Sequence, residues 1–179
     1  MFELTQDIAR EFLDYDPDTG ALTWRPREAK WFANTGASKT WNKRFAGKPA
    51  FTASDARNYK MGTILGENQK AHRVIWLWFY GEWPDVIDHI NGIPFDNRVA
   101  NLRSVDTWSN CKNSSQRKDN TSGHTGVAWY APRNKWRVQI SKDKKNSHVG
   151  YYNTLESALQ ARKVAEIENG YHENHGRAA

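Results

Sequence analysis

Four polar residues in the middle of the chain are of the types that could hydrolyse a phosphodiester bond. Asp88 and His89 are adjacent, and Asn101 and Asn110 follow 12 and 21 residues after His89. This reaction needs a base for water, neutralisation of the charge that builds on the phosphorane and leaving 3′ oxygen, and a phosphate held in line. A histidine can be the base near neutral pH. A carboxylate and an amide oxygen can hold a hard divalent ion that neutralises the charge.

Two short strands are predicted to carry the first of these residues. VIDHI, residues 86–90, and NLRSV, residues 101–105, read as strands with a polar loop between them. Asp88 and His89 would point to opposite faces of a flat strand. A bend or a strand end after Asp88 is therefore needed if both are to serve one site, and Asn91–Gly92 is a suitable place for the chain to turn.

Helices are predicted on both sides of this pair of strands. Residues 71–80 are mostly apolar and predict a buried helix that ends at Gly81. Residues 106–118 predict a second helix, which could pack over the hairpin. This second helix would bring Asn110 to the site as a second oxygen ligand.

The motif that these residues form is longer than the four. It consists of His72-Arg73, Asp88-His89-Ile90-Asn91-Gly92, Asp96-Asn97-Arg98, Asn101-Leu102 and Asn110. In this order and spacing it resembles the HNH endonucleases, particularly the homing and phage types. The resemblance implies a ββα-metal fold, in which a β-hairpin and a helix surround one metal ion.

The resemblance also implies a role for each matching residue. Asp88 and Asn110 are expected to be metal ligands, His89 the general base, and Asn101 the residue that orients the histidine through backbone contacts. The cofactor is expected to be one divalent ion, Mg²⁺ or alternatively Mn²⁺ or another. His72 and Arg73 match the preceding helix and are expected to support the site or touch phosphate.

Each residue also has an ordinary structural interpretation when taken alone. An Asp-His pair, Asn-Gly and Asp-Asn are common in surface turns. Asn101 could be a turn residue, Asn110 a solvent-facing helix residue, and Asn97 a part of the loop only. The order and spacing of the whole set favour the nuclease. Cys111, the single cysteine, is expected to be a small buried apolar residue and excludes the four-cysteine zinc site that braces some HNH proteins.

The C-terminal part predicts three strands, a turn between each pair, and a helix. The strands are residues 126–130, 135–141 and 147–152, and the helix is residues 154–170. Gly126-Val127, Lys135-Trp136, Ile140, Val149-Gly150-Tyr151 and Thr154 resemble the ethylene-response-factor (Apetala-two) type DNA-binding domain over residues 122–170. That resemblance implies a three-stranded sheet in the major groove with the helix packed behind it.

The middle strand of this module predicts which side chains meet DNA. If Trp136, Val138 and Ile140 face the helix, alternate residues face outward. The residues expected to contact DNA in the whole chain are His72, Arg73, Arg133, Lys135, Arg137, Gln139, Ser141, Lys142, Lys144 and Lys145. A solvated basic face explains the turn lysines equally well. The first strand departs from plant members because Ala128 and Tyr130 stand where those have arginines, so base readout by this strand is not expected.

The N-terminal part is less regular. It predicts a helix over residues 5–13, a turn at Pro17 and Gly20 that enters a strand, and a hairpin before residue 71. Residues 25–58 are rich in Gly, Thr, Asn and Lys and predict irregular loops and short strands. The stretch DYDPDTGALTW resembles the opening of many phage HNH proteins.

Composition agrees with a nucleic-acid partner. The 179 residues include 26 Lys and Arg against 20 Asp and Glu, giving a net charge of +6 and a pI of about 9.4. The chain has no apolar run of membrane-spanning length and no signal-peptide pattern at its start. A cytoplasmic location in a bacterial or phage-infected cell is therefore expected.

These patterns together predict an α+β protein that cuts double-stranded DNA. Residues 1–70 would extend the catalytic domain, 71–118 form the nuclease core, 119–125 a linker, 122–170 the DNA-binding domain and 171–179 a tail. One HNH site breaks one strand, so a double-strand break would need a dimer or two sequential events. The alternatives are a non-catalytic DNA-binding regulator with a relic HNH region, and an RNA-binding module.

Overall fold

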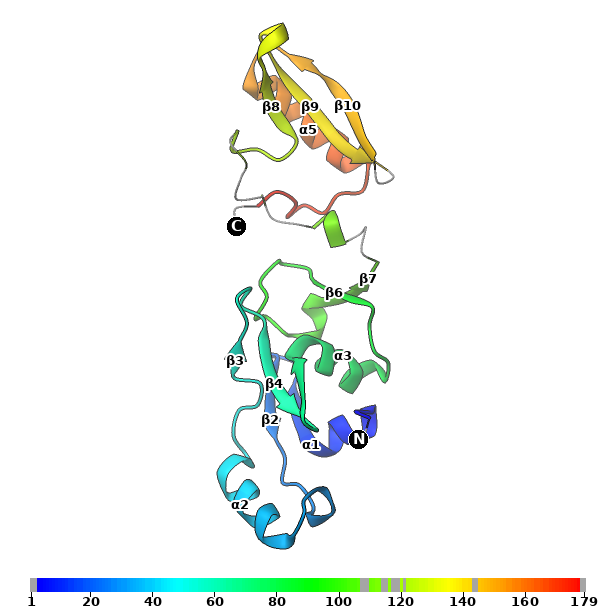
Figure 1. Cartoon of the computed structure of the whole chain (residues 1–179). Helices are drawn as coiled ribbons and strands as arrows, with labels where there is room; N and C mark the ends of the chain where they lie inside the picture. Colours follow the sequence, from blue (N-terminus) through cyan, green and yellow to red (C-terminus); the bar gives the residue numbers. More distant parts are fainter. Residues whose placement is uncertain are drawn as a thin grey trace. The chain divides into compact units, whose positions relative to one another are not determined.

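The computed structural model describes residues 3–106, 110–113, 116, 120, 122–142 and 145–177. It divides into two compact units, Met1–Val105 and Asp106–Ala179, and each unit is described by itself (Figure 1). Helices and small antiparallel sheets occur in both units, so the expected α+β class is confirmed.

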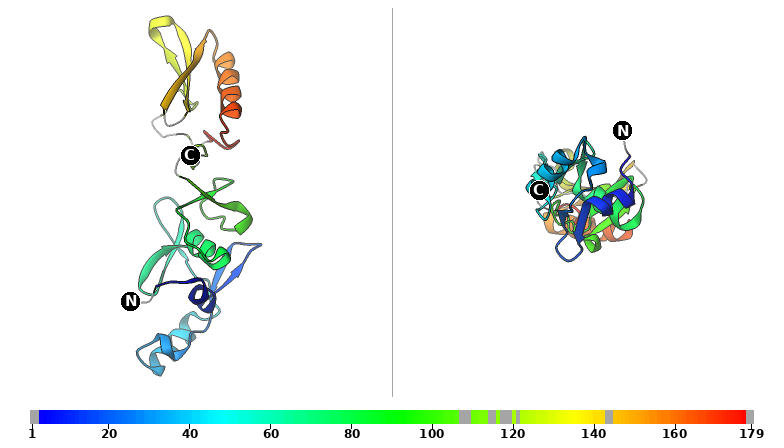
Figure 2. Two further views of the ribbon diagram at one scale, coloured as in Figure 1. Left: turned by 90° about the vertical axis from the view of Figure 1, so that its right-hand side faces the viewer. Right: turned by 90° about the horizontal axis from the view of Figure 1, so that it is seen from below.

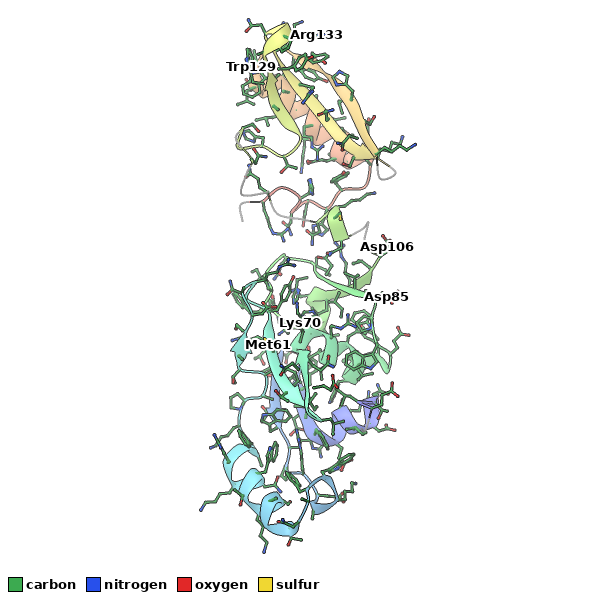
Figure 3. All side chains as sticks on the ribbon, viewed as in Figure 1. Met61, Lys70, Asp85, Asp106, Trp129 and Arg133 are labelled. Carbon is green, nitrogen blue, oxygen red and sulfur yellow. The ribbon has the colours of Figure 1, made fainter. Side chains whose placement is uncertain are left out.

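The first unit contains three helices and three small sheets among its described residues. In chain order the elements are α1 (Gln6–Phe12), β1 (Leu13–Asp16), β2 (Ala21–Trp24), α2 (Thr35–Phe45), β3 (Ala53–Ser54), β4 (Lys60–Ile64), β5 (Glu67–Lys70), α3 (Ala71–Tyr80), β6 (Val86–His89) and β7 (Leu102–Val105). The sheets are the pair β1–β2, the set β3–β4–β5 and the pair β6–β7. Met61 and Lys70 are partners across β4 and β5 (Figure 3).

Helix α3 forms the centre of the first unit's core. Its residues Val74, Ile75 and Leu77 are buried, as the apolar run in the sequence predicted. The helix ends at Gly81, whose φ of 82° lets its N–H reach back to the carbonyl of Leu77. The core around α3 includes Phe12 of α1, so helix packing joins the N-terminal region to the later strands.

The prediction of irregular loops over residues 25–58 was wrong for α2. Asn34 caps this helix by accepting a hydrogen bond from the N–H of Ala37. Trp41 and Phe45 then pack against the core cluster, and Trp41 contacts the ring of Trp24 edge-on. The sequence of α2 is poor in strong helix formers, so tertiary packing and the cap outweigh local propensity here.

The second unit contains the three strands and the helix that were expected. They are β8 (Val127–Tyr130), β9 (Lys135–Lys142), β10 (Lys145–Tyr152) and α5 (Leu155–Glu168), and β9 is the central strand. Figure 2 shows α5 lying along one face of the sheet. Val138 and Ile140 are buried and Trp136 packs against the cluster under the helix, so the predicted inner face of β9 is confirmed.

Two expectations about the start of the second unit had different outcomes. Cys111 is exposed, so its prediction as a buried residue was wrong. Asn110 and Cys111 are helical, and the N–H of Asn110 donates to the carbonyl of Asp106 at 3.1 Å. Most of the predicted helix over 106–118 lies outside the described residues. Within the described ranges, no helix has both the length and the apolar character needed to cross a membrane.

Candidate active site

The hairpin of β6 and β7 separates Asp88 from His89. Asp88 pairs with Arg103 across the strands, and His89 pairs with Leu102. Neighbouring residues on a strand face opposite sides, so the two side chains diverge as the sequence indicated. His89 is the last residue of β6, and the N–H of Gly92 donates to its carbonyl in the turn that follows. The strand therefore ends immediately after the pair.

His89 lies in a closely packed polar environment. It is 4% exposed, and its Nε2 donates to the side-chain oxygen of Asn97 at 3.1 Å. Its ring centre lies 5.2 Å from that of His72 and 5.7 Å from that of Tyr59. Burial lowers the pKa of His89, although its hydrogen bond to Asn97 and the charge of Asp88 oppose the shift. The imidazole is therefore neutral at neutral pH.

His72 is a buried neighbour of His89. It is 6% exposed, and its Nδ1 is buried with no hydrogen-bond partner. Burial, with the positive charges of nearby groups, lowers the pKa of His72 to about 3. A buried, neutral His72 is poorly placed for the expected phosphate contact. Its position agrees better with the alternative role of supporting the site. Arg73 is partly exposed, and its Nη1 donates to the carbonyl of Asp85.

Asp88 is held by a cation on the other face of the hairpin. Its Oδ2 accepts hydrogen bonds from Nε and Nη2 of Arg103 at 2.9 and 2.6 Å, and its residue is 7% exposed. The negatively charged oxygens of a carboxylate in such a pair are also the kind of ligand that a hard cation prefers. Nowhere in the described part of the chain do three or more His, Cys, Asp or Glu side chains gather into a metal-binding group.

Asn101 joins the two ends of the loop between β6 and β7. Its side-chain nitrogen donates to the side-chain oxygen of Asn91 at 3.0 Å and to the carbonyl of Asp96 at 2.8 Å. Its side-chain oxygen accepts the N–H of Asn91, and its carbonyl accepts the N–H of Ile90. These contacts fix the backbone directly after His89, and the role of Asn101 in orienting the histidine stays a prediction.

The hairpin of β1 and β2 supports the same loop from the N-terminal region. The hydroxyl of Tyr15 donates to the carbonyl of Asn97 at 3.0 Å and accepts the N–H of Val99 at 2.8 Å. Gly20 has a φ of 73°, and a Cβ there would lie 2.6 Å from the backbone nitrogen of Arg98. Asn97, Tyr15 and Gly20 were not predicted as site residues. The DYDPDTG stretch contained the signal for the last two.

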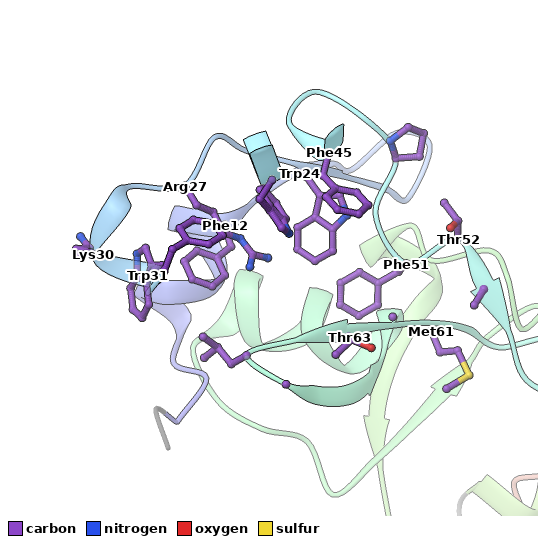
Figure 4. A pocket seen from close by; sticks show the side chains of 17 residues that line it. Phe12, Trp24, Arg27, Lys30, Trp31, Phe45, Phe51, Thr52, Met61 and Thr63 are labelled. Carbon is purple, nitrogen blue, oxygen red and sulfur yellow. The ribbon is translucent and has the colours of Figure 1, made fainter. Parts of the chain in front are cut away.

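A cavity of the first unit lies away from this polar cluster. It has a volume of about 820 Å³, and seven of its 17 lining residues are aromatic (Figure 4). The guanidinium of Arg27 lies 3.9 Å from the ring centre of Phe12 and 4.2 Å from that of Trp41. None of the predicted HNH residues lines it. The polar cluster is thus built into a hairpin and its loop.

Asn110 belongs to the second unit, in a segment that the end of the chain holds. The N–H of Asn113 donates to the carbonyl of Asn110 at 3.1 Å. Nη1 of Arg177 donates to the carbonyl of Asn113 at 2.6 Å, and the N–H of Gln116 donates to the carbonyl of Arg177 at 2.8 Å. Because each unit is described by itself, the pairing of Asp88 with Asn110 stays a prediction.

Most side chains predicted to meet DNA in the second unit lie on the outward side of the sheet or in its turns. Partly exposed side chains are those of Lys135, Arg137, Gln139 and Ser141, and exposed ones are those of Arg133, Lys142 and Lys145; Lys144 lies outside the described residues. The guanidinium of Arg137 lies over the ring of Tyr130 at 5.2 Å, and that of Arg133 over the ring of Tyr151 at 4.5 Å. The outward face therefore combines cations with aromatic rings.

Comparison with known proteins identifies the class of the hairpin region. Residues 69–108 match the HNH endonuclease family. The match contains Asp88, His89, Asn97 and Asn101 and ends two residues before Asn110. It confirms the HNH prediction for this part of the chain and supports DNA endonuclease activity at the level of that family.

A second comparison covers more of the chain. Over 112 residues the chain is 31% identical to Protein 3.8 of Escherichia phage T7, and the alignment covers 62% of this chain and 88% of that protein. The chain belongs to the same family as this phage protein. No solved structure matches the chain.

We predict that Gly20→Ala destabilises the first unit more than Gly47→Ala does. Both glycines have a φ near 75°, which costs a non-glycine residue about 1–2 kcal/mol. Only at Gly20 would the new methyl group also meet backbone, because nothing lies within 4 Å at Gly47. Urea unfolding should show a lower free energy for Gly20→Ala. Equal losses for the two variants would contradict the close approach of Gly20 to the loop.

We also predict that His72 makes the first unit sensitive to acid. Its pKa is about 3 in the folded protein and 6.5 ordinarily, so the unfolded chain binds the proton more readily. Its contribution to stability is complete above pH 6.5 and is lost as the pH falls toward 3. The loss at pH 5 is about 2 kcal/mol.

The measurement is the free energy of urea unfolding at pH 8 and at pH 5. Between pH 8 and pH 5 the free energy of unfolding should fall by about 2 kcal/mol less in His72→Phe than in wild type. In His124→Ala, a change outside the cluster, it should fall as much as in wild type. Identical pH dependence of wild type and His72→Phe would show that His72 is not buried in its neutral form.

Proposed function

We propose that this protein is a metal-dependent DNA endonuclease of the homing or phage HNH type. The observation that carries the proposal is His89, a buried neutral histidine at the end of β6 with one ring nitrogen held by Asn97. The HNH match over residues 69–108 and the family relationship to a phage protein support it. The reaction is hydrolysis of a phosphodiester bond by water.

His89 acts as the general base in this proposal. An amide oxygen only accepts hydrogen bonds, so the contact with Asn97 places the imidazole proton on Nε2. Nδ1 is then the nitrogen that takes a proton from the attacking water. The lowered pKa of His89 keeps the imidazole in the form that can accept this proton at neutral pH.

Asp88 and Asn110 are the proposed ligands of one divalent ion, with Mg²⁺ as the first candidate and Mn²⁺ as the next. Their carboxylate and amide oxygens are hard donors, which suits either ion. When bound, the ion neutralises the charge that develops on the phosphate and the leaving oxygen. Arg103 holds the Asp88 carboxylate in place through two hydrogen bonds. Two protein ligands leave positions for water and phosphate.

Asn101 and Asn97 are positioning residues in this site. Asn101 fixes the loop that begins after His89, and Asn97 fixes the proton on the ring. Tyr15 in turn holds the backbone of Asn97. General-base catalysis requires the base within hydrogen-bond reach of its water, so these contacts maintain the required geometry.

The second unit is the proposed DNA-binding part, in agreement with its basic strands and its resemblance to the ethylene-response-factor type domain. Strand β9 contains Lys and Arg, β10 begins with a Lys, and β8 has neither; within residues 127–142 and 145–152 there is no Asp or Glu. Such a sheet attracts the phosphate backbone. A regulator with a relic HNH region is the alternative, and loss of cleavage in a His89 variant separates the two.

We predict that His89→Ala abolishes metal-dependent cleavage while DNA binding is retained. Loss of a general base costs about 10²–10⁴-fold in rate. The measurement is nicking of plasmid or phage DNA with Mg²⁺, repeated with a chelator. DNA affinity is measured by fluorescence anisotropy.

A matched variant controls for loss of a histidine elsewhere. His124→Ala should cut at the wild-type rate. Undiminished cleavage by His89→Ala would exclude His89 as the base, and cleavage that survives the chelator would exclude the metal.

We further predict that Asn97→Leu slows cleavage and that Asn97→Asp keeps a larger part of the wild-type rate. Leucine removes the acceptor from Nε2 of His89, whereas aspartate keeps an oxygen there. The rate with Asn97→Leu should fall by about tenfold or more, which corresponds to losing a buried hydrogen bond.

Nitrogen NMR of the imidazole provides a second readout for this pair of variants. Wild type and Asn97→Asp should carry the proton on Nε2 of His89, and Asn97→Leu should not favour that tautomer. Equal rates and unchanged tautomers in all three proteins would show that Asn97 has only a structural role.

A further inference from the structure

The outward face of the second unit's sheet carries a cluster of three rings. None of the three is among the residues that the sequence predicted to contact DNA. Tyr130 of β8 and Tyr151 of β10 have ring centres 5.4 Å apart, and His148 lies 4.5 Å from Tyr151. Tyr130 and Tyr151 are partly exposed and His148 is exposed. We call these three residues the aromatic face.

A β-bulge in β10 places His148 and Tyr151 on one side. Residues three apart on a regular strand point to opposite faces. Here His148 pairs with Gln139 and Tyr151 with Arg137, and the register shifts between His148 and Gly150. Gln139 and Arg137 are two residues apart on β9 and share its outward face. The bulge therefore moves His148 to the side of Tyr151.

Cations surround the aromatic face. Arg137 lies over the ring of Tyr130, and Arg133, in the turn between β8 and β9, lies over the ring of Tyr151. Lys135 pairs with Tyr130 across the two strands. An anionic polymer with flat, apolar groups matches this combination of charge and rings.

We propose that the aromatic face binds unpaired DNA, with bases stacked on Tyr130 and Tyr151 and phosphates held by Arg133, Lys135 and Arg137. The inference rests on the proposed DNA-binding role of this unit. It specifies an unpaired strand of DNA as the partner of this face. Inside a duplex both faces of a base are covered by its neighbours, so these rings can stack only on a base that has left the duplex. Side chains that read a major groove instead need polar ends that reach base edges.

Strand β8 of this sheet lacks the side chains that would favour groove reading. Ala128 and Tyr130 occupy the outward positions of β8, so this strand offers no cation or amide to base edges. The guanidinium groups of Arg137 on β9 and Arg133 in the turn lie over tyrosine rings, at 5.2 and 4.5 Å from the ring centres. Such Arg–Tyr pairs leave flat surfaces on which a base can stack.

The experiment compares single-stranded and duplex DNA of the same sequence, about 16 nucleotides long to cover one binding face. The protein is the full chain with His89→Ala, in chelator, so that no strand is cut. Fluorescence anisotropy should show tighter binding to the single strand by tenfold or more. A strand with abasic sites in its centre should bind at least tenfold more weakly than the intact strand.

Variants of the two tyrosines identify the rings as the cause. Tyr130→Leu and Tyr151→Leu together should weaken single-strand binding tenfold or more, whereas the two Tyr→Phe changes should stay within twofold of the parent. Trp129→Leu removes an exposed ring whose strand position faces the opposite side of the sheet and should also stay within twofold. Circular dichroism and thermal melting confirm that each variant is folded.

Each contrary result overturns the inference in a distinguishable way. Equal or tighter binding to duplex, or undiminished binding to the abasic strand, would show that bases do not stack on this face. Loss of binding in the Phe variants would assign the effect to the tyrosine hydroxyls. Binding to neither form of DNA would overturn the proposed DNA-binding role of the unit itself, whereas the cleavage test at His89 concerns the first unit.

Discussion

The structure depends on satisfying the buried polar groups of one loop. The chain between β6 and β7 contains three asparagines and one aspartate, and Asn97 and Asn101 are buried near His89. A buried donor or acceptor without a partner costs about 1–3 kcal/mol, so the loop can exist only if its groups bond to one another. Asparagine meets this need because its side chain both donates and accepts. Asn91, Asn97 and Asn101 together hold the loop and the imidazole.

This constraint explains why the HNH hairpin needs the N-terminal region. A two-stranded hairpin is at best marginally stable in water by itself. Here β6 and β7 contribute Ile87 and Leu102 to a core that also contains Phe12 and α3. Tyr15 and Gly20 then contact the backbone of the loop and hold the β1–β2 hairpin close to it. The N-terminal region is therefore part of the support for His89 and is more than an extension of the domain.

The two units solve the placement of functional side chains differently. In the first unit, strand alternation separates Asp88 from His89, and each side chain has its own partner on its own face. In the second, a bulge overrides alternation and gathers His148 and Tyr151 on one face. The end of β6 at His89 and the bulge in β10 are both places where the backbone can depart from the geometry of a flat strand.

Most of the architecture could be predicted because it follows from local patterns. Apolar runs predicted α3, alternation predicted the faces of β9, and the spacing of Asp88, His89 and Asn101 predicted an HNH region. The helix α2 could not be predicted, because its stability comes from Trp41 and Phe45 packing on distant aromatic rings. Cys111 was wrongly expected to be buried, because residue type alone does not fix exposure.

The sequence by itself determined which residues are available for chemistry, since order and spacing are properties of the chain. Only the tertiary structure decided that Asn97 holds His89, that His72 is buried against it, and that Tyr15 holds the loop from 82 residues away. Local propensity carries no information about such contacts. They arise because burying the loop forces each polar group to find a partner wherever the fold supplies one.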